Sequence, residues 1–115
     1  MKTIITTFLI LSYAMAALAD SAEKEITALI AAVQNEKGMF FIRNGSEHTA
    51  AEAADHLRRK RKAAGEKIKT SEDFITYCGT GSSVTGSRYK VKFADGREEF
   101  ADQFLKAQLQ RIRHP

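Results

Sequence analysis

Residues 41–60 carry most of the side chains that could bind a ligand. Gly45 permits a tight turn, and Thr49 is placed to begin a helix whose free N–H groups and positive dipole end favour an anion such as a carboxylate or phosphate. The structural alternative is that Thr49 only caps the helix and that Arg43 pairs with a nearby acid such as Glu47. The candidate contact residues in this stretch are Arg43, Asn44, His48 and Thr49.

A second group of polar side chains lies in the stretch from Gly79 to Ser87, which is rich in Gly, Ser and Thr. Such composition is typical of a loop and often of a flexible connection. The stretch lacks the Lys-Ser or Lys-Thr pair of a phosphate-binding loop. If it lies beside the turn at Gly45, its hydroxyl groups could close over a bound anion. The candidates there are Ser82, Ser83 and Thr85.

His48, Glu52 and His56 are spaced four residues apart, which places them on one face of a helix. Two imidazoles and a carboxylate can hold zinc. However, the two histidines of a helix would lie about 12 Å apart along its axis, at about 1.5 Å per residue. We therefore predict no metal and no cofactor. A small hydrolase-like enzyme is the alternative, with His48 or His56 as base, Glu52 orienting it, and a loop serine or Cys78 as nucleophile.

The chain has one cysteine, which excludes an internal disulfide bond and a Cys-rich zinc site. Cys78 lies close to Phe74 and Ile75 in a segment with helical spacing. We interpret it as a buried small apolar residue rather than a nucleophile.

The run from Arg58 to Lys62 is the strongest local concentration of charge in a chain of net charge +4. Five consecutive helical residues point all around the helix, and cations near the C-terminal end complement its dipole. We therefore expect no nucleic-acid partner. A basic surface that binds an anionic lipid or polymer is a further alternative.

The first nineteen residues resemble an export signal. A short positive start is followed by a mostly apolar run from Ile4 to Leu18, and Ala17 and Ala19 supply the small-x-small pattern of signal peptidase. The run is shorter than the roughly 20 residues that a membrane-spanning helix needs. We expect cleavage between Ala19 and Asp20, which leaves residues 20–115 as a single domain.

The rest of the chain alternates helical and extended patterns. Apolar spacing predicts helices from about residue 20, from Thr49 to about Ala64, after Thr70, and over the last fifteen residues. Short strands are expected at residues 39–42 and 89–93, and Asp95-Gly96 is a hairpin signal. This pattern predicts a mostly helical α+β domain of about four helices with a small antiparallel hairpin or sheet.

An ordered series of short motifs resembles the YfeK-like family of small, uncharacterised exported bacterial proteins. The motifs are Phe41-Ile42-Arg43-Asn44-Gly45, His48-Thr49, Glu52-Ala53, His56-Leu57-Arg58-x-Lys60, Ile68-x-Thr70, Phe74-Ile75, Ser82-Ser83-x-Thr85-Gly86, Tyr89-x-Val91 and Phe104-Leu105. The resemblance implies a periplasmic protein of a Gram-negative bacterium and implies no activity. Together with the polar cluster, it favours a non-enzymatic binding or accessory module for a small anion or a periplasmic protein.

Overall fold

The computed structural model describes residues 20–115, so the expected signal peptide and its cleavage point after Ala19 lie outside the described chain. The elements in chain order are a helix over residues 20–34, β1 (Phe40–Arg43), β2 (Ser46–Thr49), α2 (Ala50–Ala64), the 3-10 helix η1 (Gly65–Lys67), α3 (Ser71–Cys78), β3 (Lys90–Lys92), β4 (Glu98–Phe100) and α4 (Ala101–Arg113). The expected mostly helical α+β fold is confirmed. Within the described residues, no helix is both long and apolar enough to cross a membrane.

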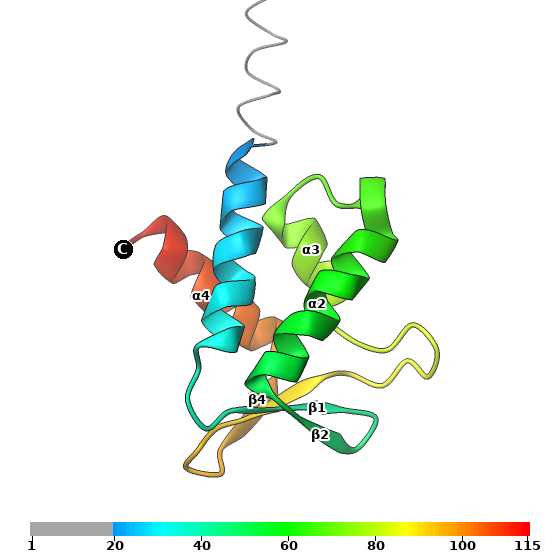
Figure 1. Cartoon of the computed structure of the whole chain (residues 1–115), viewed down its shortest axis with the longest axis vertical. Coiled ribbons are helices and arrows are strands. Elements are labelled where there is room, and N and C mark those ends of the chain that lie inside the picture. Colours follow the sequence, from blue (N-terminus) through cyan, green and yellow to red (C-terminus); the bar gives the residue numbers. More distant parts are fainter. Residues whose placement is uncertain (1–19) are drawn as a thin grey trace, which may run out of the picture.

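The four strands form one antiparallel sheet in the order β2-β1-β3-β4, with the helices against one of its faces (Figure 1). The register aligns Phe41 of β1 with His48 of β2 and with Val91 of β3. Aligned residues share a face of a sheet, and Phe41 and Val91 are buried, so all three side chains face the helices. Arg43 follows Phe41 by two residues and lies on the same face.

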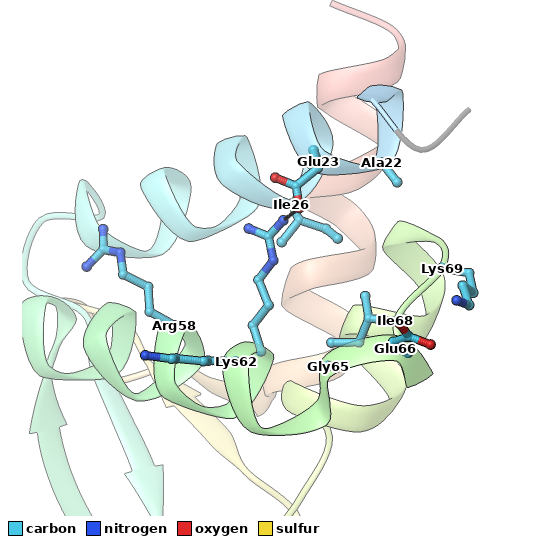
Figure 2. A pocket seen from close by; sticks show the side chains of 10 residues that line it. Ala22, Glu23, Ile26, Arg58, Lys62, Gly65, Glu66, Ile68 and Lys69 are labelled. Atoms are coloured by element: carbon cyan, nitrogen blue, oxygen red, sulfur yellow. Dashed lines mark hydrogen bonds and ion pairs between the residues drawn. The ribbon is translucent and has the colours of Figure 1, made fainter. Parts of the chain in front are cut away.

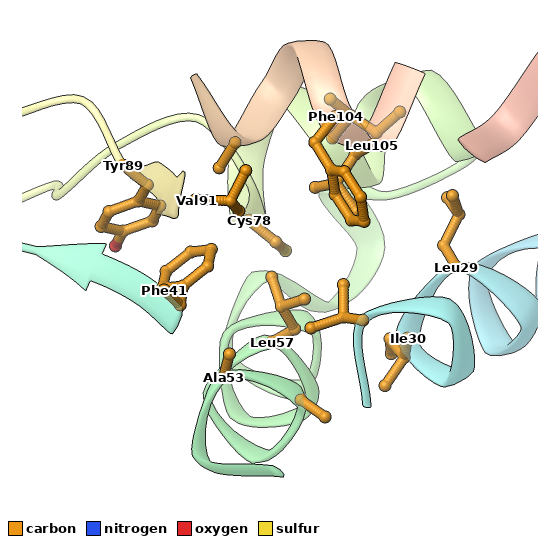
Figure 3. Close-up of a cluster of buried hydrophobic side chains, with 14 of the residues drawn as sticks. Leu29, Ile30, Phe41, Ala53, Leu57, Cys78, Tyr89, Val91, Phe104 and Leu105 are labelled. Carbon is orange, nitrogen blue, oxygen red and sulfur yellow. The ribbon is translucent and has the colours of Figure 1, made fainter. Parts of the chain in front are cut away.

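Two helices cover the inner face of the sheet. α2 packs against β1 and β2, while α4 packs against β3 and β4. The buried residues of α2 are Ala53, Ala54 and Leu57, and the two alanines leave room for close approach. Leu57 points into the central apolar cluster (Figure 3). Besides the three residues of α2, this cluster contains Ile26, Leu29, Ile30, Val33, Met39, Phe41, Phe74, Ile75, Cys78, Tyr89, Val91, Ala101, Phe104, Leu105 and Leu109.

The connection between β1 and α2 differs from expectation. The prediction that the turn at Gly45 leads directly into a helix is wrong, because β2 stands between them. Asn44 and Gly45 have φ angles of 53° and 79°, as in the two-residue turns whose twist suits a hairpin. The predicted cap is confirmed: the Thr49 hydroxyl accepts from the Glu52 N–H (3.2 Å), and Glu52 Oε1 accepts from the Thr49 N–H (2.9 Å).

An ion-pair network joins the first helix to α3 and α4. Glu25 accepts two hydrogen bonds from the Arg113 guanidinium (2.8 and 3.0 Å) and one from the Ser71 hydroxyl (2.6 Å). Arg113 also donates to Glu72 (2.6 Å). The bonds from Arg113 and then Ser71 lower the pKa of Glu25 to about 2. The carboxylate is therefore ionised through the whole neutral range.

We predict that this network makes the fold sensitive to acid. The pKa of Glu25 is lower in the folded state than its ordinary value of 4.5, so its contribution is complete above pH 4.5 and is lost as the pH falls towards 2. Glu25→Gln should lower the free energy of unfolding at pH 7 by about 1 kcal/mol, after allowance for solvent screening. It should also flatten the acid dependence. Urea unfolding at several pH values measures both effects.

Glu98→Gln is the matched control, because Glu98 is exposed on β4. It should change the free energy of unfolding by less than about 0.5 kcal/mol. Equal acid sensitivity in wild type and Glu25→Gln would contradict the assignment.

Candidate functional site

A hollow of about 330 Å³ opens between α2 and the β1–β2 hairpin, and we call it the hairpin hollow. The buried side chains of Phe41 and Ala53 contribute to its lining. Strand alternation brings Arg43 and His48 to it from the sheet, since both lie on the inner face. The helical repeat brings four polar residues to it from α2, because positions three, four and seven residues apart share a face. These are Glu52, Asp55, His56 and Arg59.

The His56 imidazole connects the hairpin hollow to the core. Its Nδ1 lies 3.2 Å from Nη1 of Arg43, and its Nε2 lies 3.4 Å from the hydroxyl oxygen of Tyr89. The ring also meets Tyr89 edge-on, at 5.6 Å between centroids. A guanidinium group can only donate, so Nδ1 accepts and the neutral ring carries its proton on Nε2.

The surroundings of His56 keep its ring uncharged at neutral pH. Burial is the largest cause, and the positive charges of Arg43, Lys60, Arg59 and His48 add to it, lowering the pKa of His56 to about 4. Each of these effects disfavours the imidazolium form. His56 is therefore a neutral hydrogen-bond acceptor for Arg43 and adds no positive charge to the hollow.

Lys60 is a second hydrogen-bond partner of the Tyr89 hydroxyl group. Its ammonium group donates to the Tyr89 hydroxyl oxygen (3.0 Å) and to the Gly81 carbonyl (3.1 Å). Tyr89 is buried directly before β3. Lys60 and His56 are one helical turn apart on α2, so both bonds to Tyr89 set the rotation of α2 against the sheet.

The acidic residues of the hairpin hollow have hydrogen-bond or ion-pair partners, whereas its two arginines have no carboxylate partner in the described chain. Within residues 20–115, no carboxylate lies within 4 Å of the Arg43 or Arg59 guanidinium. Both acids of the lining are engaged elsewhere: Glu52 accepts from the Thr49 backbone (2.9 Å), and Asp55 pairs with Arg58 (2.8 Å). Among the described residues, the hollow thus has two cations that lack a carboxylate partner.

The helix-start geometry expected for the candidate residues needs correction. Arg43 and Asn44 do not lie at the start of α2, because the four residues of β2 separate the turn from the helix. His48 is in β2 and not on the helix, so it does not share a helical face with Glu52 and His56. The sheet register brings His48 and Arg43 to one hollow instead. The proposed pairing of Arg43 with Glu47 is wrong, since Glu47 pairs with Lys92 (3.2 Å).

Of the loop candidates, Thr85 contacts the hairpin, and it does so at the tip rather than at the hollow. The Thr85 hydroxyl donates to the Asn44 side-chain carbonyl (2.8 Å). The Ser82 hydroxyl oxygen accepts from the backbone of Val84 and Thr85, and Ser83 is exposed. Among the described residues that line the hollow, none comes from this loop. The loop and the turn are therefore adjacent, but they do not form one composite cavity with Arg43.

Neither imidazole of the candidate site is hydrogen-bonded to a serine, threonine or cysteine side chain in the described chain. The partners of His56 are Arg43 and the phenol of Tyr89. Cys78 is buried at the end of α3, and burial raises the pKa of its thiol, which disfavours the reactive thiolate. Over residues 20–115, no three His, Cys, Asp or Glu side chains are grouped as metal ligands.

A larger groove of about 670 Å³ lies between the first helix and the C-terminal half of α2 (Figure 2). Two of its arginines already have partners, and Lys62, Glu66 and Lys69 also line it. Arg61 pairs with Glu23 across the groove, and Arg58 donates to Asp55 (2.8 Å) and to Gln34 (2.6 Å). These contacts tie two helices together, so the groove is a weaker candidate for an anion site than the hairpin hollow.

The run from Arg58 to Lys62 is distributed around α2. Arg59 lines the hairpin hollow, Lys60 turns towards Tyr89, and Arg61 turns towards the first helix. Each helical residue is rotated by about 100° from the one before, and this rotation divides the run among different neighbours.

Arg59, Lys60 and Tyr89 contribute to the site and were not among the candidate contact residues. Arg59 is separated by seven residues from Glu52, so helical spacing could have identified it as a neighbour of the hollow. Tyr89 directly precedes β3 and follows His56 by 33 residues. Their contact depends on the pairing of β1 with β3, which no local pattern encodes.

We predict that His56 titrates near pH 4 rather than near its ordinary value of 6.5. Arg43→Gln should raise the pKa of His56, because one of the neighbouring positive charges is removed while burial remains. Imidazole chemical shifts followed by NMR over pH 3–8 measure both values. Arg111→Gln is the control, since it removes an exposed charge from α4. A wild-type His56 that titrates at 6.5 would contradict the buried, neutral assignment.

Comparison with known proteins gives a family without an assigned function. Residues 20–113 match the Family of unknown function (DUF5329). The "Uncharacterized protein YfeK" of Salmonella typhimurium is 39% identical over 67 residues, which cover 58% of this chain and 56% of that protein. The match thus spans little more than half of that relative's length. No solved structure matches the chain. The chain belongs to the DUF5329 family of uncharacterised, YfeK-like proteins.

Proposed function

We propose that this protein is an exported, non-enzymatic binding module whose hairpin hollow takes a small carboxylate or phosphate anion. One observation carries the proposal: Arg43 and Arg59 come from two different elements, line the same hollow and have no carboxylate partner within the described residues. Arginine presents a planar array of donors that suits the oxygen atoms of both anion types.

The surroundings of Arg43 favour release of its guanidinium to a ligand. Its hydrogen-bond partner is the neutral ring of His56, at 3.2 Å. A hydrogen bond between an ionised donor and an ionised acceptor is stronger than one to a neutral acceptor. An anion that enters the hollow therefore offers Arg43 a better partner than the imidazole does.

The hydrolase alternative has less support. It requires a nucleophile within hydrogen-bond reach of an imidazole. His56 contacts Arg43 and Tyr89, and among the described residues no serine of the 79–87 loop lines the hollow. A basic surface for lipid or polymer also has less support, because Arg58 and Arg61 are engaged in ion pairs.

We predict that inorganic phosphate binds in the hairpin hollow and that both arginines contribute. Arg43→Gln and Arg59→Gln should each weaken binding about tenfold, since a charge-assisted hydrogen bond contributes about 1.5 kcal/mol. NMR titration with phosphate, repeated with acetate, measures the dissociation constants and separates the two anion types. Arg111→Gln on α4 should bind like wild type. A folded Arg43→Gln protein with wild-type affinity for both anions would refute this site.

Export rests on the residue pattern of positions 1–19, and the periplasm of a Gram-negative cell is the proposed destination. We predict that the protein recovered from a periplasmic extract begins at Asp20, as intact-mass spectrometry would show. Ala19→Gln should block processing, because signal peptidase requires a small residue at this position. Ser21→Gln, on the other side of the cleavage point, should be processed normally. Recovery of the unprocessed chain from the cytosol would contradict the prediction.

A further inference from the structure

We propose that the Arg43–His56 contact is a proton-controlled latch: protonation of His56 releases Arg43 into the hairpin hollow, and an anion binds there together with a proton. The inference rests on the proposed function and adds how that site is regulated. It concerns two side chains that line the same hollow and are bonded to each other at 3.2 Å.

The first step is the tautomer that the neighbours impose on His56. Arg43 donates to Nδ1, so this ring nitrogen is unprotonated and presents a lone pair to Arg43. Nε2–H is held against the Tyr89 hydroxyl oxygen, which Lys60 also contacts at 3.0 Å. The contact with Tyr89 therefore holds the ring in place on its Nε2 side, and only Nδ1 can gain a proton without rotation of the imidazole.

The second step follows from adding that proton. Nδ1–H and the Arg43 guanidinium would then be two cationic donors at a separation that suits only a donor and an acceptor. The contact must open, because two donors cannot bond to each other and their charges repel. An anion between them would satisfy both, and Arg43 and His56 both border a hollow of about 330 Å³ in which it could lie.

The third step is the reciprocal effect of the anion on the proton. The pKa of His56 is low because of burial and because of the cations that face the ring. An anion beside those cations would offset part of their field and favour the imidazolium form. By linkage, acid must then strengthen anion binding by the same factor. The groups that face His56 or share its hollow are Arg43 on β1, His48 on β2, Glu52, Asp55, Arg59 and Lys60 on α2, and Tyr89 before β3.

Sulfate is the probe for this proposal, because it stays a dianion between pH 5 and 8 and phosphate does not. The dissociation constant of wild type should fall at least about tenfold from pH 8 to pH 5, since one proton is taken up with the anion. Calorimetry in two buffers with different ionisation enthalpies should show proton uptake. His56→Gln should bind sulfate with a flat pH profile. His114→Gln, at a histidine outside the hollow, should keep the wild-type slope, and His48→Gln tests whether the other histidine of the hollow carries that slope.

A measurement on wild type keeps the proposal testable if His56→Gln does not fold. The NMR titration of His56 should move to a higher pH by about two units or more in saturating sulfate relative to sodium chloride at equal ionic strength, since a smaller shift from about 4 gives less than a tenfold gain in affinity at pH 5. The His114 resonances serve as the internal control. Sulfate binding with no pH slope and an unmoved His56 titration would overturn the latch and leave the anion site standing. A slope that follows His48 would also overturn it, and no binding of sulfate or phosphate at any pH would overturn both proposals.

Discussion

The uncharged imidazole of His56 joins three parts of the fold that are distant in the sequence. It accepts from Arg43 on β1, belongs to α2, and contacts Tyr89 ahead of β3. The Tyr89 hydroxyl oxygen in turn accepts a hydrogen bond from Lys60, which also donates to the Gly81 carbonyl in the loop. A positive charge on this ring would face other cations across a half-buried site, which is costly. The hairpin, α2 and β3 therefore keep this arrangement only while the ring is neutral.

Close packing of α2 on the sheet makes that arrangement possible. Ala53 and Ala54 are fully buried and leave little bulk, so the helix can approach β1 closely while Leu57 fills the core. The polar residues on the adjoining face of α2 are then carried to the edge of the sheet. The hollow thus results from the small apolar side chains on the buried face of α2. The two alanines contribute little hydrophobic area, but they let α2 approach the sheet closely enough to bring its charged side chains to the hollow.

Local patterns were sufficient for most of the elements and insufficient for the site. The cap at Thr49, the helix after Thr70, the strand around Val91 and the last helix all follow from short-range chemistry, and the structure confirms them. The strand at residues 46–49 was missed, although Asn44-Gly45 is itself a strong signal for a two-residue hairpin. The contact between His56 and Tyr89 requires the pairing of β1 with β3, which depends on the whole fold.

The distribution of ion pairs says more about a ligand than the total charge does. A net charge of +4 and a run of five cations suggest a basic surface. In the fold, Arg58 and Arg61 are held by partners, and Lys60 supports Tyr89. Paired charges on a surface contribute little attraction for a further anion, whereas cations in a concave site without acidic partners retain their field. An anion site in the hollow therefore depends on Arg43 and Arg59, whereas Arg58, Lys60 and Arg61 are engaged by the neighbours of α2.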